Sequence, residues 1–172
     1  MMSITHDLPD SRWRKLEAWL DRAFSGKRRK NGDSMAQHSK NVGRRLAARG
    51  LDDVTVFAGY CHDVLEDTDL TAEALRAVAI DVLGSAALAD EAVALVVEVS
   101  YSDAEYALAK PERKSVACRR WIDSPNPRVA AVKMADVEDN LSTADLVSEA
   151  FGREYRAWAE PLYAALARKH PR

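Results

Sequence analysis

The sequence predicts an all-α protein that folds as one helical bundle of about seven or eight helices. Apolar residues recur three and four positions apart along most of the 172 residues, which is the spacing of an amphipathic helix. We find no convincing segment with the strict apolar–polar alternation of a half-buried strand. Hydrophobic residues form 47% of the chain and charged residues 30%, a balance typical of a single domain with a sizeable core.

Capping residues and glycines set the limits of the N-terminal helices. Ser11, Ser34, and either Asp52 or Asp53 are suited to open helices, because their side chains accept hydrogen bonds from free backbone N–H groups. Gly26 and Gly50 are suited to close them. The helices expected from these signals cover residues 11 to 25, 34 to 50, and 52 to about 67, with a basic loop at residues 27–33.

Similar signals divide the rest of the chain. Thr71 and Gly84 bracket a fourth helix, and Pro111 marks a break or a fresh start within a helical stretch. Two prolines in Ser124-Pro125-Asn126-Pro127 stop that stretch. The remaining helices are expected at 71 to 84, 88 to 99, 102 to 123, 128 to about 143, and about 145 to 169. We expect residues 1–172 to form a single domain, with a core at about 10–145 and a C-terminal helix at about 145–169.

Charge and cysteine content narrow the function classes. The net charge is −2 and the sequence pI about 6.1, so the chain has no general attraction to nucleic acid or to anionic membranes. No apolar run is long enough to cross a bilayer. Two cysteines do not make a disulfide scaffold, and the first residues lack the pattern of a secretory signal. We therefore expect a cytoplasmic protein without nucleic-acid or membrane partners.

Side chains that can bind a metal or exchange a proton are most closely spaced in the segment His62-Asp63-Val64-Leu65-Glu66-Asp67. On an uninterrupted helix, residues four positions apart are neighbours, so His62 would stack with Glu66 and Asp63 with Asp67. This pattern predicts one hydrated, acidic helix face that carries an imidazole.

Metal-ligand residue types come from three separate helices: His38, His62 with Asp63, and Asp136. Two imidazoles and two carboxylates suit Mn²⁺, Fe²⁺, Zn²⁺ or Mg²⁺, with positions left for water and substrate. A metal held in this way acts as a Lewis acid and lowers the pKa of bound water. Phosphoryl transfer to water is the natural use of such a site.

Each of these residues also has an ordinary structural interpretation. A single helical histidine is more often a satisfied or solvated side chain than a ligand. Glu66 and Asp67 can be a solvated helix end, and Asp136 can form a surface ion pair with Lys133. Cys61 next to His62 suggests a zinc site, but neighbouring helical residues point about 100° apart. We expect Cys61 to lie in the core.

The joint spacing of His38…His62-Asp63…Asp136 resembles the HD superfamily of metal-dependent phosphohydrolases. Three segments make the resemblance more specific. They resemble the (p)ppGpp hydrolase domain of Rel/SpoT-type alarmone enzymes and the stand-alone small alarmone hydrolases. Residues 62–68 resemble the HD-x-x-E-D-T motif, and residues 128–141 are similar to R-V-x-x-V-K-x-A-D-x-x-x-N-[LM]. Residues 29–32, Arg-Lys-Asn-Gly, resemble the R-K-x-G segment that precedes the first metal histidine.

The resemblance implies a single-domain HD-type bundle and a specific division of roles. It implies that one Mn²⁺ is bound by His38, His62, Asp63 and Asp136. Glu66 and Asp67 would activate the attacking water. The nucleotide would be contacted by Arg29, Lys30, Asn140 and Thr143. The implied reaction removes the 3′-pyrophosphate of ppGpp or pppGpp, giving GDP or GTP and pyrophosphate.

The chain departs from the family pattern at three places in or near the motifs. Ser39 replaces the usual proline, Met35 lies near a position often held by tyrosine, and Ser142 replaces a common arginine. These departures leave two alternatives open. One is an HD phosphohydrolase acting on another nucleotide, such as a nucleoside monophosphate or an NADPH-like 3′-phosphate. The other is a non-catalytic nucleotide-binding HD module. The sequence does not indicate the oligomeric state.

Overall fold

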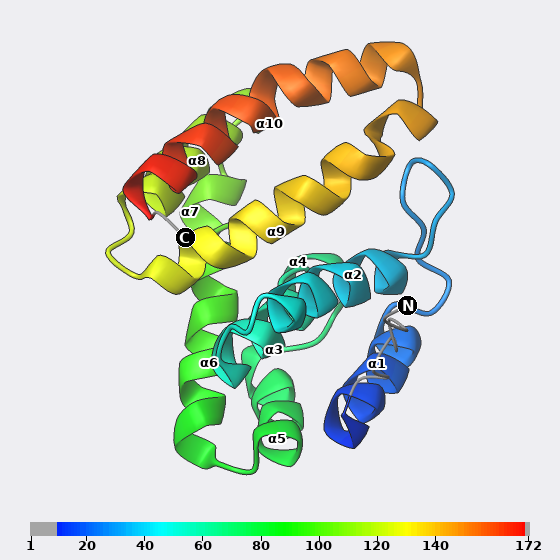
Figure 1. The fold of residues 1–172 in the computed structure, drawn as a ribbon, viewed down its shortest axis with the longest axis vertical. Helices are drawn as coiled ribbons and strands as arrows, with labels where there is room; N and C mark the ends of the chain where they lie inside the picture. Colours follow the sequence, from blue (N-terminus) through cyan, green and yellow to red (C-terminus); the bar gives the residue numbers. More distant parts are fainter. Residues whose placement is uncertain (1–9, 171–172) are drawn as a thin grey trace, which may run out of the picture.

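The computed structural model describes residues 10–170, and in that range it contains helices and no β-strand (Figure 1). Eight helices have nine or more residues, and two have four. The all-α prediction is therefore confirmed. The elements are α1 (Ser11–Ala23), α2 (Met35–Ala48), α3 (Asp53–Cys61), α4 (Val64–Asp67), α5 (Ala72–Leu83), α6 (Ala86–Val99), α7 (Asp103–Tyr106), α8 (Lys110–Asp123), α9 (Pro127–Thr143), the 3₁₀-helix η1 (Ala144–Leu146) and α10 (Glu149–Lys169).

Most helix limits follow from the local sequence, with small corrections. The side chain of Asp10, rather than Ser11, caps α1, and Asp52 caps α3. Gly84 closes α5 in the left-handed conformation, with φ of 68°, which glycine adopts without steric cost. Pro111 lies in the first turn of α8, so it marks a fresh start. The expected last helix is preceded by η1 and begins at Glu149.

The expected continuous helix from residue 52 to 67 is wrong. The α-helix α3 ends at Cys61, and α4 begins at Val64, so His62 and Asp63 form a turn between them. The Nδ1 atom of His62 contacts the carbonyl oxygen of Gly59 at 2.9 Å, which ties the ring to the end of α3. His62 is only 2% exposed and does not lie on a hydrated face. The predicted stacking of His62 on Glu66 therefore does not apply.

The α3 helix is the centre of the fold, and all of its residues after Asp53 are buried. It contacts α2, α6 and α9. Two glycines allow α2 and α3 to approach closely, because a Cβ atom on Gly43 would collide with the Tyr60 ring, and one on Gly59 would collide with Leu46. This contact brings the C-terminal end of α3 against α2, which carries His38. Cys61 lies in the core at 0% exposure, as expected.

The helices α9 and α10 lie antiparallel and in contact, with η1 at the turn between them (Figure 1). The α9 helix also packs on α2 and α3, so it connects the central helices to the C-terminal ones. None of the helices between residues 10 and 170 is long and apolar enough to span a membrane. The N-terminal residues that bear on the expected absence of a secretory signal lie outside the described range.

Candidate metal centre and adjoining pocket

Four side chains from α2, α9 and the α3–α4 turn converge on one point. The Nε2 atoms of His38 and His62 are 3.2 Å apart. One carboxylate oxygen of Asp136 lies 3.2 Å from Nε2 of His38 and 3.6 Å from that of His62. One oxygen of Asp63 lies 3.6 Å and 3.2 Å from the same two nitrogen atoms. The structure thus brings together the four predicted metal ligands.

These separations fit donors around one ion. Ligand atoms about 2.1 Å from a common metal lie roughly 3.0–3.5 Å apart when the angles between them are about 90–110°. The donor atoms of His38, His62 and Asp136 all lie within 4.8 Å of one another. Asp63, which follows His62 in the turn after α3, lies close to both imidazole nitrogen atoms and completes the candidate set.

Both imidazoles are held through their Nδ1 atoms, which leaves Nε2 directed at the centre. The Nδ1 atom of His62 contacts the backbone oxygen of Gly59, as described above. The Nδ1 atom of His38 lies 2.7 Å from a carboxylate oxygen of Asp139, which is 1% exposed. An Nδ1–H that donates to these oxygens leaves the Nε2 lone pair free for a metal. Asp139 was missed at the sequence level, although it lies one turn beyond Asp136 on the same helix.

Asp136 is embedded in a buried polar network. Its Oδ1 accepts a hydrogen bond from Asn140 at 2.6 Å, and its Oδ2 pairs with the Lys133 amine at 3.0 Å. The side chains of Lys133 and Asp136 are only 9% and 14% exposed, so this is not a surface ion pair. The Lys133 amine also lies 4.1 Å from the centroid of the Trp121 ring. Lys133, Asp136 and Asn140 share one face of α9, because they stand at positions i, i+3 and i+7.

The pKa shifts of His62, His38 and Asp136 indicate strong mutual charge stabilisation. Burial alone would lower the pKa of His62, but the Asp63 charge and hydrogen bonds to Asp136 and Asp63 raise it well above its ordinary value. Hydrogen bonds to Asp136 and Asp139 likewise outweigh burial and raise the pKa of His38. Burial would raise the pKa of Asp136, but Lys133 and the two histidines hold it well below its usual range. The metal-free site therefore favours two anionic carboxylates beside cationic imidazoles.

Glu66 and Asp67 follow the cluster on α4. The Glu66 carboxylate accepts a hydrogen bond from the Tyr101 backbone N–H at 3.0 Å and from the Tyr106 hydroxyl at 3.4 Å. Burial and the nearby Asp63 charge raise the pKa of Glu66 to about 7. The same two causes raise the pKa of Asp67, whose side chain is exposed. Glu66 is thus a half-buried carboxyl group poised to exchange a proton near neutral pH.

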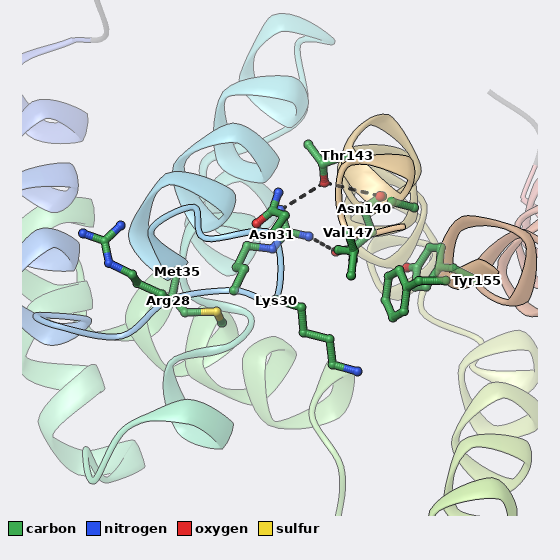
Figure 2. A pocket seen from close by; sticks show the side chains of 11 residues that line it. Arg28, Lys30, Asn31, Met35, Asn140, Thr143, Val147 and Tyr155 are labelled. Carbon is green, nitrogen blue, oxygen red and sulfur yellow. Dashed lines mark hydrogen bonds between the residues drawn. The ribbon is translucent and has the colours of Figure 1, made fainter. Parts of the chain in front are cut away.

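A pocket of about 300 Å³ adjoins the cluster through Asn140. It lies between the basic loop and the α9–η1–α10 segment (Figure 2). All four predicted nucleotide contacts, Arg29, Lys30, Asn140 and Thr143, line it. The remaining lining residues are Arg28, Asn31, Met35, Ala144, Val147, Phe151 and Tyr155.

Arg29 connects the loop to α9. Its guanidinium group hydrogen-bonds to the Asn140 side-chain oxygen and, at 3.3 Å, to the Thr143 hydroxyl. It also lies 3.8 Å from the Asp139 carboxylate. Lys30 is more exposed, and its amine lies 5.0 Å from the centroid of the Phe151 ring. Arg28 points away from α9 and donates to the Gly32 carbonyl oxygen at 2.9 Å (Figure 2).

A second, larger groove of about 860 Å³ continues from this pocket, since Lys30, Phe151 and Tyr155 line both. Its other basic residues include Lys110 and Lys114, which are four positions apart on α8. The Lys114 amine lies 4.1 Å from the centroid of the Trp158 ring. These residues were missed at the sequence level. The signal was present in the basic i, i+4 pair of α8 and in the aromatic residues spaced along α10.

The comparisons with known proteins agree with this geometry. The HD domain family model matches residues 17–171 of the chain. The chain belongs to the HD domain family. The resemblance drawn from the motifs is therefore confirmed at the family level. HD domains bind divalent metals, and the cluster of His38, His62 and Asp136 is this chain's candidate site.

Similar proteins include two bacterial enzymes of alarmone metabolism. A GTP pyrophosphokinase of Streptomyces coelicolor is 31% identical over 149 residues, which is 87% of this chain and 16% of that protein. A guanosine-3′,5′-bis(diphosphate) 3′-pyrophosphohydrolase of Aquifex aeolicus is 29% identical over 143 residues, 83% of this chain and 19% of that protein. The chain thus spans less than a fifth of the length of these relatives.

One solved structure is similar over nearly the whole chain. It is a metazoan orthologue of SpoT described as hydrolysing ppGpp, and the match has a TM-score of 0.75. The match covers 95% of this chain and 90% of that one at 23% sequence identity. At this identity the similarity shows that the two share a fold.

Proposed function

We propose that this protein is a divalent-metal-dependent phosphohydrolase that removes the 3′-pyrophosphate of ppGpp or pppGpp. The observation that carries this proposal is the convergence of four metal-ligand side chains beside Glu66 and next to a cationic pocket. The names of the relatives and the description of the metazoan structure support the choice of substrate.

His38, His62, Asp63 and Asp136 would hold the metal. We favour Mn²⁺ because two imidazoles and two carboxylates form a mixed nitrogen and oxygen site that leaves positions open. When bound, the metal supplies Lewis-acid stabilisation of the phosphoryl oxygen atoms and lowers the pKa of water. Lys133 stabilises the negative charge of Asp136 through its Oδ2 atom, whereas Asn140 of the pocket donates to its Oδ1 atom.

Glu66 would act as the general base. Its pKa of about 7 in the metal-free site suits proton transfer near neutral pH. Water would attack the phosphorus bound to the ribose O3′, so that a new oxygen–phosphorus bond forms while the O3′–P bond breaks and its electron pair goes to the ribose oxygen. Glu66 would take one proton from the water and pass it to the ribose oxygen, so that GDP or GTP is released with a free 3′-hydroxyl and the attacked phosphorus is released in pyrophosphate. Asp67 would orient the same water from the exposed side of α4.

The pocket and groove together would bind the rest of a nucleotide with two phosphate arms. The Arg29 and Asn140 side chains offer donors and an acceptor for a base or ribose. The groove that continues past Lys30 offers the charges of Lys110 and Lys114 for the phosphates that are not cleaved.

One departure from the family pattern favours keeping a second candidate substrate. Met35 lines the pocket, so it bears on base recognition. Ser39 is fully buried in α2, and the exposed Ser142 donates to the Asp139 carbonyl oxygen, so neither lines the pocket. The alternative to an alarmone is therefore a nucleoside monophosphate or the ribose phosphate of a dinucleotide such as NADPH, in which it is carried on the 2′ oxygen.

The test is a metal-reconstituted substrate panel. The protein is stripped with a chelator, reloaded with Mn²⁺, Mg²⁺ or Zn²⁺, and assayed on ppGpp, pppGpp, GMP and NADPH. We expect pyrophosphate and GDP or GTP from the first two, with Mn²⁺ restoring the most turnover. Release of inorganic phosphate from NADPH alone would select the alternative substrate. Binding without turnover of any nucleotide, with every metal, would indicate a non-catalytic module.

A further inference from the structure

We propose that Asp139 is a positioning residue of the metal centre, which orients His38 and couples it to Arg29 of the substrate pocket. The inference rests on the proposed metal-dependent function. It assigns a role to a side chain outside the four ligands, the two α4 carboxylates and the four predicted nucleotide contacts.

The two histidines are held in different ways. His62 is oriented by the carbonyl oxygen of Gly59, three residues earlier in the same segment. His38 is oriented by a side chain 101 residues away, at an Nδ1-to-oxygen distance of 2.7 Å. A carboxylate that accepts from Nδ1–H fixes the ring and makes Nε2 a stronger donor to a metal. The orientation of His38 therefore depends on the docking of α9 onto α2.

Burial of the Asp139 carboxylate without charged or hydrogen-bonding partners would destabilise the fold. Asp139 is 1% exposed, and an isolated buried carboxylate is strongly unfavourable. The second oxygen of Asp139 lies 3.4 Å from an Arg45 guanidinium nitrogen, and an Arg29 nitrogen lies 3.8 Å from the oxygen that contacts His38. These cations come from α2 and from the basic loop. The carboxylate is thus fixed from three sides, as an orienting group must be.

Arg29 reaches the partners of two metal ligands at once. It bonds to Asn140, which donates to Asp136, and it lies beside Asp139, which contacts His38. One turn of α9 therefore supplies a ligand and the side chains that orient ligands. A substrate that binds the Arg29 guanidinium group would change the contacts of Arg29 with Asn140 and Asp139. Because these two residues orient the proposed metal ligands, metal binding and substrate binding should be coupled.

The decisive variant is Asp139→Asn, which keeps the size of the side chain and removes its charge. The matched control is Glu138→Gln, the neighbouring residue on α9, which pairs with Arg49 and Tyr163 away from the centre. Mn²⁺ affinity is measured by titration with electron paramagnetic resonance, and thermal unfolding is measured with and without metal. Loss of an outer partner of a metal histidine typically weakens metal binding about 10–100-fold.

We expect Asp139→Asn to lose metal affinity in that range while its metal-free unfolding temperature stays close to that of Glu138→Gln. Co²⁺-loaded Asp139→Asn should show an altered visible absorption spectrum, and Asp139→Glu should recover part of the affinity. Parental Mn²⁺ affinity and an unchanged Co²⁺ spectrum in Asp139→Asn would overturn the proposal. So would an affinity loss matched by an equal loss in Glu138→Gln.

The metal measurements also separate this inference from the proposed function. A parent protein that binds Mn²⁺ but hydrolyses none of the nucleotides would refute the hydrolase proposal. The affinity comparison between the two variants would still decide the role of Asp139. In an active parent, Asp139→Asn at saturating Mn²⁺ should lower kcat more than it changes KM, because the group acts on the metal ligand.

Discussion

The candidate metal centre and the proposed substrate pocket adjoin each other but are built in opposite ways. His38 and His62 are 3% and 2% exposed, and they are held by contacts among three packed segments. Lys30 in the pocket is exposed on a loop, and its described partner is an aromatic ring at 5.0 Å. The buried centre specifies a chemistry by mutual contacts. In the open pocket, an exposed side chain such as Lys30 can change without disturbing the centre, whereas Arg29 and Asn140 are connected to Asp136.

The largest expected effect comes from removing a metal ligand. His38→Ala and Asp136→Ala should each lose bound metal and activity, by more than the ~10–100-fold that loss of an outer partner costs. Metal content of the purified variants and turnover with added Mn²⁺ provide the measurement. Cys61→Ala is the control, because Cys61 is buried in the core next to His62. Retained metal in Asp136→Ala would remove that residue from the centre.

The next effect separates catalysis from metal binding. Glu66→Gln and Asp67→Asn should keep metal near the parental level and lower kcat, since loss of a general base typically costs ~10²–10⁴-fold. Single-turnover rates at saturating Mn²⁺ measure this directly. Asp69→Asn, an exposed neighbour, is the control. If the α4 variants lose metal instead, they belong to the ligand set, and an unchanged kcat would make them a solvated helix end.

The stability of the protein to unfolding should change with pH in opposite directions with and without bound metal. The raised pKa values of His38 and His62 mean that protons compete with the metal, so metal affinity should rise with pH, by about tenfold per pH unit for each proton displaced. In the metal-free protein, the raised histidine pKa values contribute stability below the unfolded value of about 6.5.

That contribution is lost as pH rises through the folded pKa values. Chelator-treated protein should therefore become less stable to urea above about pH 6.5, while Mn²⁺-loaded protein gains stability over the same range. Paired unfolding curves at several pH values measure both slopes. A metal-free protein whose stability rises with pH across this range would contradict the charge state described for the cluster.

The pocket should respond through substrate affinity. Arg29→Ala should raise KM by about 10–100-fold, because hydrogen bonds to charged groups contribute roughly 1.5–3 kcal/mol. Lys30→Ala should raise KM only a few-fold, because its described contact is a partly exposed cation–ring pair. Steady-state kinetics on the best substrate compares the two. Equal and parental KM values would show that neither side chain contributes to substrate binding.

The smallest effect concerns stability alone. Ser39 replaces the proline usual in the resembled family, and its buried hydroxyl has no hydrogen-bond partner among the described residues. Ser39→Ala removes that unsatisfied group, so it should stabilise the protein by up to about 1 kcal/mol. Thermal unfolding checks the sign. A destabilised Ser39→Ala with parental metal affinity would show that the hydroxyl has a partner, such as an ordered water.

The sequence was sufficient to propose the candidate ligands and insufficient to predict the geometry that brings them together. Caps, glycines and apolar spacing predict most of the helices because those signals are local. The turn at His62 and Asp63 contains no glycine or proline, and the His62 imidazole contacts the Gly59 carbonyl oxygen there. An apolar helical pattern runs through it, so the continuous helix was the natural and wrong prediction.

The missed residues share a physical reason. The role of Asp139 depends on a partner distant in sequence, His38. The roles of Lys110 and Lys114 depend on a groove that α8 forms with α10. The close approach of α2 and α3 depends on Gly43 and Gly59, which in one sequence are indistinguishable from other helical glycines. Motif spacing found Arg29 and Asn140, but only their contact shows that they belong to one network.

The contact between α2 and α3 also imposes an order of assembly on the centre. His38 on α2 and His62 in the turn after α3 are 24 residues apart, whereas Asp139 is 101 residues from His38. Short-range contacts close faster during folding because less chain entropy is lost. The imidazole pair therefore has the topology of an early folding unit, and the carboxylates of α9 complete it late. Tight binding of a metal by the proposed centre would therefore report that α9 has docked onto α2.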